Sequence, residues 1–162
     1  MKLYTLTAVK SAIIASVYAA TTIVLGYLSY GGLQFRISDA MLILPLFEGM
    51  GLEAVVGLAI GGLLGNLASP FVPWDWVFGP AANLLASIIV YLIRMSKLRP
   101  LLKLTASSVL AALAVALLVG FELTVIYGLP ALVYMYLFVS ELVVIAGIGG
   151  LVYRSLKVFT SE

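Results

Sequence analysis

The chain has 162 residues, of which 64% are hydrophobic and only 10% are charged, and its formal net charge is +2. Soluble domains carry about a quarter charged residues, so this composition excludes an ordinary water-facing surface and favours a protein embedded in lipid. The sequence has no Cys and no His, which excludes disulfides, thiol chemistry and the usual nitrogen and sulfur ligands of a metal site. The small net charge does not indicate a nucleic-acid partner.

Apolar stretches follow one another along the whole chain and predict six transmembrane helices in a single domain, residues 1–162. They cover residues 8–28, 38–48, 52–68, 76–94, 104–126 and 130–153. A helix needs about 20 apolar residues to cross a hydrocarbon core of ~30 Å. Most stretches meet this length or nearly do, but the second has only roughly a dozen residues and contains Pro45.

The basic residues indicate whether the second stretch crosses the membrane. Cytoplasmic loops collect Lys and Arg. If all the stretches cross, eight of the nine basic residues lie on one side. These are Lys2, Lys10, Arg94, Lys97, Arg99, Lys103, Arg154 and Lys157. We therefore expect six spans with both termini in the cytoplasm, and a second helix that is short, tilted or broken near Pro45.

The opposite, outer side of the predicted bundle is acidic. One basic and four acidic residues, with a net charge of −3, lie there or in the outer half of the membrane: Arg36, Asp39, Asp75, Glu122 and Glu141. Glu141 is ~16 Å along the last stretch, near the bilayer midplane, and Glu122 is ~8 Å below the outer end of its helix. An ionisable group in the membrane costs at least ~2.5 kcal/mol, so both carboxylates are expected to face a cavity or a partner.

Two asparagines and Arg36 are further candidates for this site. Asn66, near the outer end of the third stretch, and Asn83, in the fourth, fit either a cavity wall or hydrogen bonds that hold helices together. Arg36 opens the second stretch beside Ser38, a candidate N-cap. Its guanidinium fits an ion pair with Asp39 or a buried glutamate as well as direct contact with a ligand.

Aromatic residues crowd the same side of the predicted bundle. Most of them are typical of the aromatic belt at a membrane interface. A planar ligand would stack on one or two of them, and Phe35, Trp74 and Phe78 are the candidates. The sequence alone does not choose among these three.

Small residues recur every fourth position in two stretches, which permits close approach between helices. In the third stretch, Gly57, Gly61 and Gly65 are expected to pack inside the protein. In the first, the pairs Ala8–Ala12 and Ala15–Ala19 have the same spacing. Composition leaves open whether that stripe packs internally or against a partner.

Two motifs resemble a known family. The segments Gln-Phe-Arg-Ile-Ser-Asp-Ala (34–40) and Gly-Asn-Leu-Ala-Ser-Pro-Phe (65–71) are similar to those of the queuosine-precursor transporter (QueT) family. The similarity continues in order through residues 75–79, 120–123 and 129–130 to the region of Glu141. These proteins are substrate-binding S-components of energy-coupling factor (ECF) transporters.

The resemblance implies a six-helix subunit of the cell membrane that captures a 7-deazaguanine precursor of queuosine from outside. It also implies two kinds of partner, a transmembrane coupling subunit and two cytoplasmic ATPases. In this family type an Ala-x-x-x-Ala stripe on the first helix, here Ala8, Ala12, Ala15 and Ala19, faces the coupling subunit. The chain contains no Gly-x-x-x-x-Gly-Lys-Ser/Thr loop, so ATP hydrolysis is assigned to the partners and no cofactor is expected here.

Other functions remain as alternatives. The chain could be an S-component for another vitamin-like compound. It could be a membrane enzyme with Asp75, Glu122 and Glu141 as acid–base groups, although no nucleophile or metal cluster supports an enzyme. It could be a membrane adaptor, but carboxylates buried on separate helices favour a binding site instead.

Overall fold

The computed structural model of the chain describes residues 2–31 and 34–160, and its regular structure within those ranges is entirely helical. For Lys2, Leu3 and residues 156–160 it describes the backbone without the side chains. In chain order the elements are α1 (Lys2–Val24), α2 (Gly26–Ser29), η1 (Ile37–Leu46), α3 (Leu52–Asn66), α4 (Asp75–Met95), α5 (Pro100–Phe121), η2 (Glu122–Ile126), α6 (Leu132–Leu142), η3 (Val143–Gly149) and α7 (Gly150–Thr160). The predicted all-helical class is confirmed.

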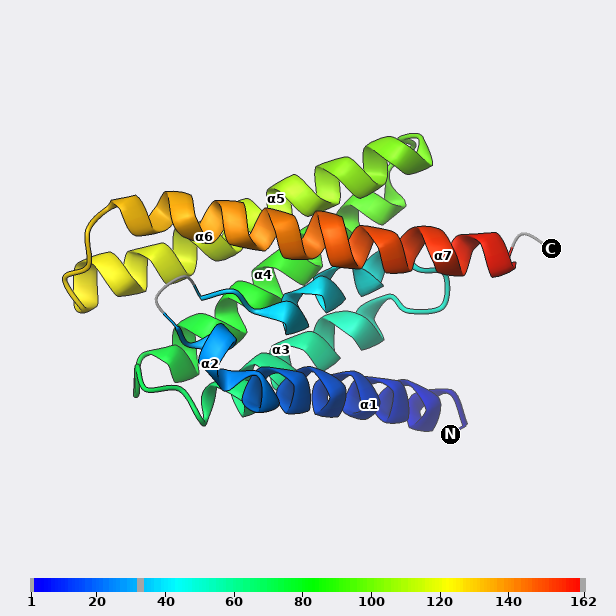
Figure 1. The fold of residues 1–162 in the computed structure, drawn as a ribbon. Helices are drawn as coiled ribbons and strands as arrows, with labels where there is room; N and C mark the ends of the chain where they lie inside the picture. Colours follow the sequence, from blue (N-terminus) through cyan, green and yellow to red (C-terminus); the bar gives the residue numbers. More distant parts are fainter. Residues whose placement is uncertain (1, 32–33, 161–162) are drawn as a thin grey trace.

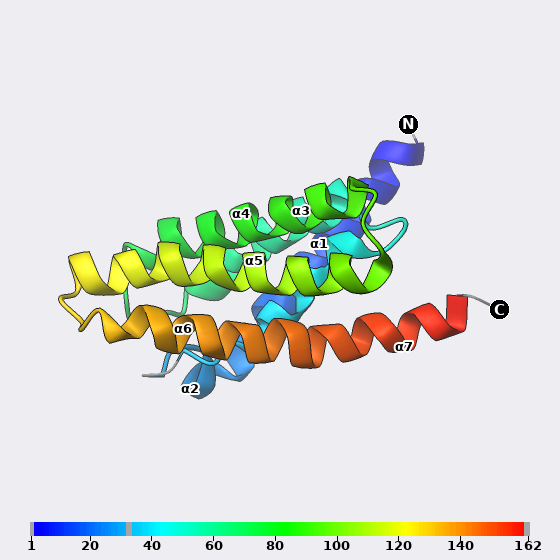
Figure 2. The same ribbon diagram turned by 90° about the horizontal axis from the view of Figure 1, so that it is seen from above.

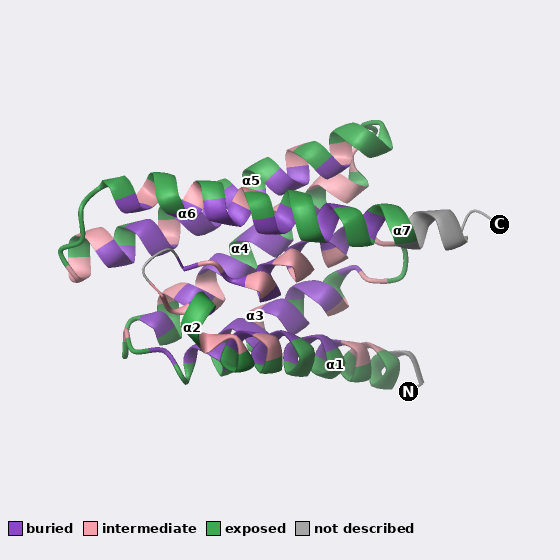
Figure 3. Ribbon diagram, viewed as in Figure 1, coloured by how far each residue is buried: buried purple, intermediate pink, exposed green. Residues whose placement is uncertain are grey.

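Four helical runs are long and apolar enough to cross a membrane. They are Tyr4–Val24, Asp75–Met95, Pro100–Ile126 and Leu132–Ser155. The second and third predicted spans correspond to the shorter apolar helices Ile37–Leu46 and Leu52–Asn66. Exposed apolar residues run along the outer faces of the long helices (Figure 3), and such a surface suits contact with lipid.

The helices lie side by side in one elongated bundle whose two ends differ (Figures 1 and 2). One end, called here the terminal end, holds the start of α1, the end of α7 and residues 47–51 and 96–99. The other, the distal end, holds residues 34–36, 67–74 and 127–131.

Basic side chains tie elements together at the terminal end. Lys10 on α1 donates to the carbonyl of Gly49 at 2.8 Å, and Arg94 at the end of α4 donates to the carbonyl of Phe47 at 3.1 Å. Lys103 on α5 donates to the carbonyl of Arg94 at 2.5 Å. The positive residues of three helices are therefore gathered at one end of the bundle.

The second predicted helix is short, as expected, and it is a 3₁₀ helix of ten residues with Pro45 inside it. Proline has no N–H to donate to a helical hydrogen bond. A 3₁₀ helix rises about 2.0 Å per residue, so η1 covers ~20 Å, where an α-helix of equal length would cover ~15 Å. The tighter winding lets a short segment reach from the distal end deep into the bundle.

Glycines on α3 allow α1 to approach it closely. A Cβ atom added at Gly57 would lie 2.8 Å from the Cβ of Ile14, and one added at Gly61 would lie 2.9 Å from the Cβ of Tyr18. A Cβ atom at Gly65 would lie 3.1 Å from the Cβ of Thr22, a tight contact. Gly57 and Gly61 have no room for a side chain and Gly65 has little, so the predicted internal packing of this glycine ladder is confirmed.

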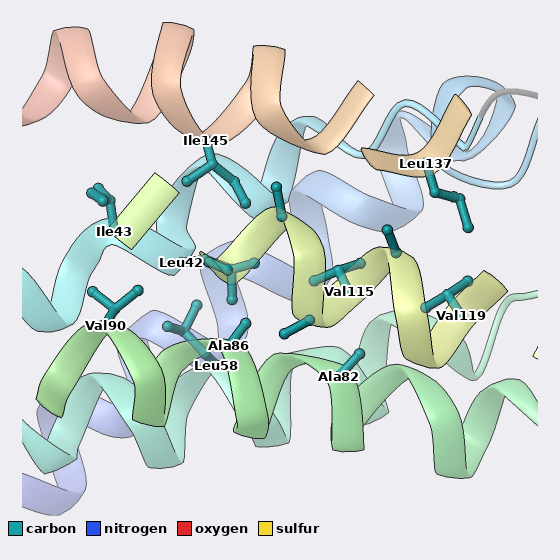
Figure 4. Close-up of a cluster of buried hydrophobic side chains, with 14 of the residues drawn as sticks. Leu42, Ile43, Leu58, Ala82, Ala86, Val90, Val115, Val119, Leu137 and Ile145 are labelled. Carbon is teal, nitrogen blue, oxygen red and sulfur yellow. The ribbon is translucent and has the colours of Figure 1, made fainter. Parts of the chain in front are cut away.

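The apolar core lies between η1 and the helices around it (Figure 4). Leu42 and Ile43 of η1 are buried among residues of α3, α4, α5 and η3. Small residues such as Ala86 on α4 let the central helix fit. The polar site described next lies toward the distal end of this core.

Candidate substrate-binding site

The structure brings the five charged residues of the predicted outer side together. They are Arg36, Asp39, Asp75, Glu122 and Glu141, and all are between 0% and 4% exposed. Arg36 precedes η1 and Asp39 lies in its first turn, whereas Asp75 begins α4, Glu122 begins η2 and Glu141 lies near the end of α6. Four separate elements therefore each contribute at least one acidic residue.

Both glutamates lie where the helical hydrogen bonding changes. Glu122 is the first residue of the π-helix η2, and Glu141 stands two residues before the π-helix η3. A π turn inserts an extra residue and redirects the side chains around it, and such turns are frequent at functional sites. This local change helps to explain how two carboxylates on long apolar helices face inward.

One group of residues, here the Asp39 cluster, consists of Tyr18, Arg36, Asp39 and Glu141. The Tyr18 hydroxyl donates to Oδ1 of Asp39, and the charges of Asp39 and Glu141 act on Arg36. In the described part of the chain, no direct ion pair joins Arg36 to an acidic residue. The ion pair predicted from the sequence is therefore replaced by a longer-range electrostatic attraction. The ring of Tyr30 lies 6.0 Å from the guanidinium carbon, within cation–π range.

A second group, here the Asp75 cluster, consists of Asn66, Ser69, Asp75 and Glu122. The Ser69 hydroxyl donates to Oδ2 of Asp75, and the charge of Asp75 acts on Glu122. The Asn66 side chain presses against Gly79, one turn after Asp75 on the same side of α4. Arg36 also acts on Glu122, so the arginine lies between the two clusters.

Several buried polar atoms of the clusters have no hydrogen-bond partner. They are Oδ2 of Asp39, Oδ1 of Asp75, Oε2 of Glu141, both carboxylate oxygens of Glu122, and both amide atoms of Asn66. Each such atom costs about 1–3 kcal/mol, and native proteins rarely leave one unsatisfied without a water, ion or ligand to complete it. Acceptors outnumber donors among these atoms, so the site is matched to a group rich in N–H or O–H donors.

A resident metal ion does not fit the arrangement. Among residues 2–31 and 34–160, no three acidic side chains gather closely enough to hold one. The carboxylates act in two separate pairs, Asp39 with Glu141 and Asp75 with Glu122.

The two predicted asparagines have different surroundings. Asn83 donates from Nδ2 to the carbonyl of Leu58 at 3.1 Å and lies against Gly62, so it joins α4 to α3. This contact fits the helix-bonding alternative. Asn66 has no such bond from its side chain and belongs to the Asp75 cluster.

The predicted stacking residues lie at the edge of the site or outside it. Trp74 is 46% exposed, and Phe78 packs against Phe121 with ring centroids 6.0 Å apart. Phe35 is half-buried beside Arg36. Contact between any of them and a ligand stays a prediction.

Tyr127 was not among the predicted site residues, although it lies beside the Asp75 cluster. Its hydroxyl donates to the carbonyl of Phe71 at 2.6 Å. Partial burial, together with the nearby charges of Glu122 and Asp75, raises the pKa of this hydroxyl. Tyr18 and Ser69 were missed as well, and the hint for Tyr18 was a phenol in the middle of an apolar helix, where it needs a partner.

The alanine stripe of α1 divides into two parts. Ala15, which lies against Gly61 of α3, and Ala19 are only 3% and 7% exposed, so they are not open to a partner in this conformation. Ala8 and Ala12 are exposed. A groove of about 490 Å³ runs between α1 and α3, with both alanines in its wall. The other residues that line it are Tyr4, Thr7, Ser11, Ala15, Ser16, Val56, Ile60 and Leu64.

The sequence of the chain is similar to that of a known family. The family model described as "QueT transporter" matches residues 8–158, nearly the whole chain. The chain belongs to the QueT transporter family. No curated protein and no solved structure matches it.

Membership of the QueT family makes the chain a membrane transport protein, in agreement with its apolar helices. The matched range contains the whole Asp39 and Asp75 clusters as well as Ala8 and Ala12. A QueT transporter implies a small-molecule substrate, and within residues 2–31 and 34–160 the buried carboxylate oxygens without a partner all lie in the two clusters.

Proposed function

We propose that the chain is the substrate-capture subunit of an ECF-type ABC importer and binds a queuosine precursor of the 7-deazaguanine type from the extracellular side. The observation that carries the substrate class is the set of unpartnered carboxylate oxygens in the two clusters. A 7-deazaguanine ring presents a ring N–H and an amino group along one edge, and these donors complement carboxylate acceptors.

The proposed topology has six spans with both termini in the cytoplasm, in a multi-pass protein of the cell membrane. The gathering of Lys10, Arg94 and Lys103 at the terminal end supports it, because basic residues favour the cytoplasmic side. The short helices η1 and α3 run along the bundle beside the longer ones (Figure 1). The distal end, with the site beneath it, would then face outward.

The proposed substrate contacts come from both clusters and the nearby loops. They are Arg36, Asp39, Asn66, Asp75, Asn83, Glu122 and Glu141, with Phe35, Trp74 or Phe78 stacking on the ring. The net charge of the acidic residues and Arg36 also suits a cationic aminomethyl group on the ligand. Such a group would be attracted by the carboxylates without needing a metal or cofactor.

The proposed partners are a transmembrane coupling subunit and two cytoplasmic ATPases, which would supply ATP hydrolysis. The exposed Ala8 and Ala12 and the groove beside them support a docking surface on α1, since small residues allow a partner helix to approach closely. The proposal for Ala15 and Ala19 is narrower. They would support the docking helix from its buried side.

Mass spectrometry of small molecules that co-purify with the protein tests the substrate. The expected result is a 7-deazaguanine derivative, released when the purified protein is denatured. Calorimetric titration of the ligand-free protein with 7-deazaguanine should then show binding. A different vitamin-like compound in the preparation, with no binding of 7-deazaguanine, would favour the alternative of an S-component for another substrate.

A further inference from the structure

The four buried carboxylates differ in how far the protein itself satisfies them. Asp39 accepts from Tyr18, and Asp75 accepts from Ser69. Glu141 has one oxygen without a partner. Glu122 has none of its acceptors satisfied, although it is 0% exposed. It is the carboxylate whose hydrogen bonding the protein leaves most incomplete.

The surroundings of Glu122 do not supply a matching donor. Arg36 acts on it electrostatically, but no basic side chain forms an ion pair with Glu122 in the described part of the chain. The charged group with the largest effect on Glu122 is Asp75, which lies within hydrogen-bonding reach of it but, as a carboxylate with a free Oδ1, has no hydrogen to donate. A carboxylate in this position is complemented best by two parallel N–H groups, as guanidinium groups show in bidentate pairs.

The rest of the Asp75 cluster narrows the ligand chemistry further. The Asn66 side chain lies along the same side of α4 as Asp75 and has both its amide oxygen and its amide nitrogen free. It can therefore donate to one acceptor of a ligand and accept from one donor. The cluster as a whole favours a planar edge with two neighbouring N–H donors and a carbonyl close by.

We propose that Glu122 determines the specificity of the substrate site, by accepting with both oxygens from two neighbouring N–H groups on one edge of a planar ligand. Asn66 contacts the same ligand on its remaining donor or acceptor. The Asp39 cluster, by contrast, contacts the ligand elsewhere and does not accept from the N–H groups of that edge. This inference rests on the proposed function, because it takes the transported substrate as the ligand of the site.

The test removes one donor from the ligand and one acceptor from the protein. The probes are 7-deazaguanine and 7-deazahypoxanthine, which lacks the exocyclic amino group. Calorimetry on the full-length purified protein should show that the loss of the amino group weakens binding by roughly 10- to 100-fold. In Glu122→Gln, one oxygen is replaced by a donor, so this ratio between the probes should shrink to about threefold or less.

Glu141→Gln is the matched control, because it makes the same chemical change in the Asp39 cluster. It is expected to leave the ratio between the two probes as in the parent, even where it alters both affinities. Elution from a sizing column and the unfolding temperature check that each variant is folded. If Glu122→Gln does not fold, Glu122→Asp replaces it, because the shorter side chain moves the acceptors back by one methylene. The ratio between the two probes is expected to shrink in the same way.

The outcomes separate this inference from the proposed function. A parent protein that binds 7-deazaguanine, with an undiminished ratio in the folded Glu122 variant, overturns the role of Glu122 and leaves the substrate intact. If the ratio between the probes shrinks in Glu141→Gln instead of Glu122→Gln, the Asp39 cluster accepts from the edge of the ligand, and the inference is overturned too. A parent protein that binds neither probe overturns the proposed substrate class and, with it, the proposed role of Glu122.

Discussion

The hydroxyl of Tyr127 donates to the backbone carbonyl of Phe71 at 2.6 Å, and the two rings meet edge to face with centroids 5.2 Å apart. Tyr127 follows η2, which begins with Glu122, and Phe71 precedes Asp75 by four residues. The contact therefore joins the two chain segments that carry the carboxylates of the Asp75 cluster. Because these carboxylates are almost completely buried, a ligand can reach them only if the distal end opens.

The first prediction concerns this contact. Tyr127→Phe keeps the ring and removes the hydrogen bond, which is worth about 0.5–1.5 kcal/mol. Opening should become easier, so bound 7-deazaguanine is expected to dissociate roughly 2- to 10-fold faster. A chase experiment with labelled ligand measures the rate. Tyr136→Phe, at an exposed tyrosine of α6, is the control, and equal rates in both variants and the parent would contradict the idea.

The second prediction concerns topology, and it uses the absence of native cysteine. Val72 in the distal loop is 45% exposed, and Lys97 at the terminal end is exposed. In intact cells, Val72→Cys should react with a membrane-impermeant thiol reagent, and Lys97→Cys should react only with a permeant one. Gel-shift labelling reads both. Reaction of Lys97→Cys with the impermeant reagent would reverse the proposed orientation.

The third prediction concerns the exposed part of the alanine stripe. Ala12→Phe fills the groove between α1 and α3 from its open side, so it should block close approach of a partner helix without disturbing the fold. Binding of 7-deazaguanine to the isolated subunit should be unchanged, while uptake into vesicles that contain the coupling subunit and ATPases should be lost. Ile13→Phe, on an exposed face that does not line the groove, should transport normally. Normal uptake by Ala12→Phe would remove the groove from the docking surface.

The fourth prediction concerns stability at the Asp75 cluster. A Cβ atom at Gly79 would overlap the Asn66 side chain, so Gly79→Ala must displace it. Overpacking of this kind costs typically 1–3 kcal/mol, and each kcal/mol lowers the unfolding temperature of a chain this long by about 2–4 °C. Gly147→Ala is the matched control, because nothing lies within 4 Å of its added Cβ. Thermal unfolding in detergent compares the two, and equal unfolding temperatures would show that Asn66 has room to move.

Much of the fold was predictable because lipid imposes simple rules on a sequence. A hydrocarbon core requires long apolar helices, and these are visible as runs of residues. The distinction between α, 3₁₀ and π hydrogen bonding was not visible. In η1 and η3 it depends on packing between elements distant in sequence, such as the close approach of Gly149 to the carbonyl of Ala40.

The charged members of the site were predictable for the same reason, since a carboxylate in a membrane helix is costly and must have a purpose. Their partners were harder to find. Ser69 and Tyr18 are ordinary residues in a membrane sequence, and their importance depends on which carboxylate they reach in three dimensions. The division of the alanine stripe was also hidden, because spacing alone does not show which side of α1 faces α3.

The glycine ladder has a mechanical consequence. Since Gly57, Gly61 and Gly65 bring the backbones of α1 and α3 into contact over several turns, neither helix can slide or tilt without carrying the other. The two helices are therefore expected to move together as one rigid unit, and the groove lies on the outer surface of that unit. A partner that displaces the groove surface would move both helices together. Because the last residue of α3 is Asn66, this movement would extend into the polar site.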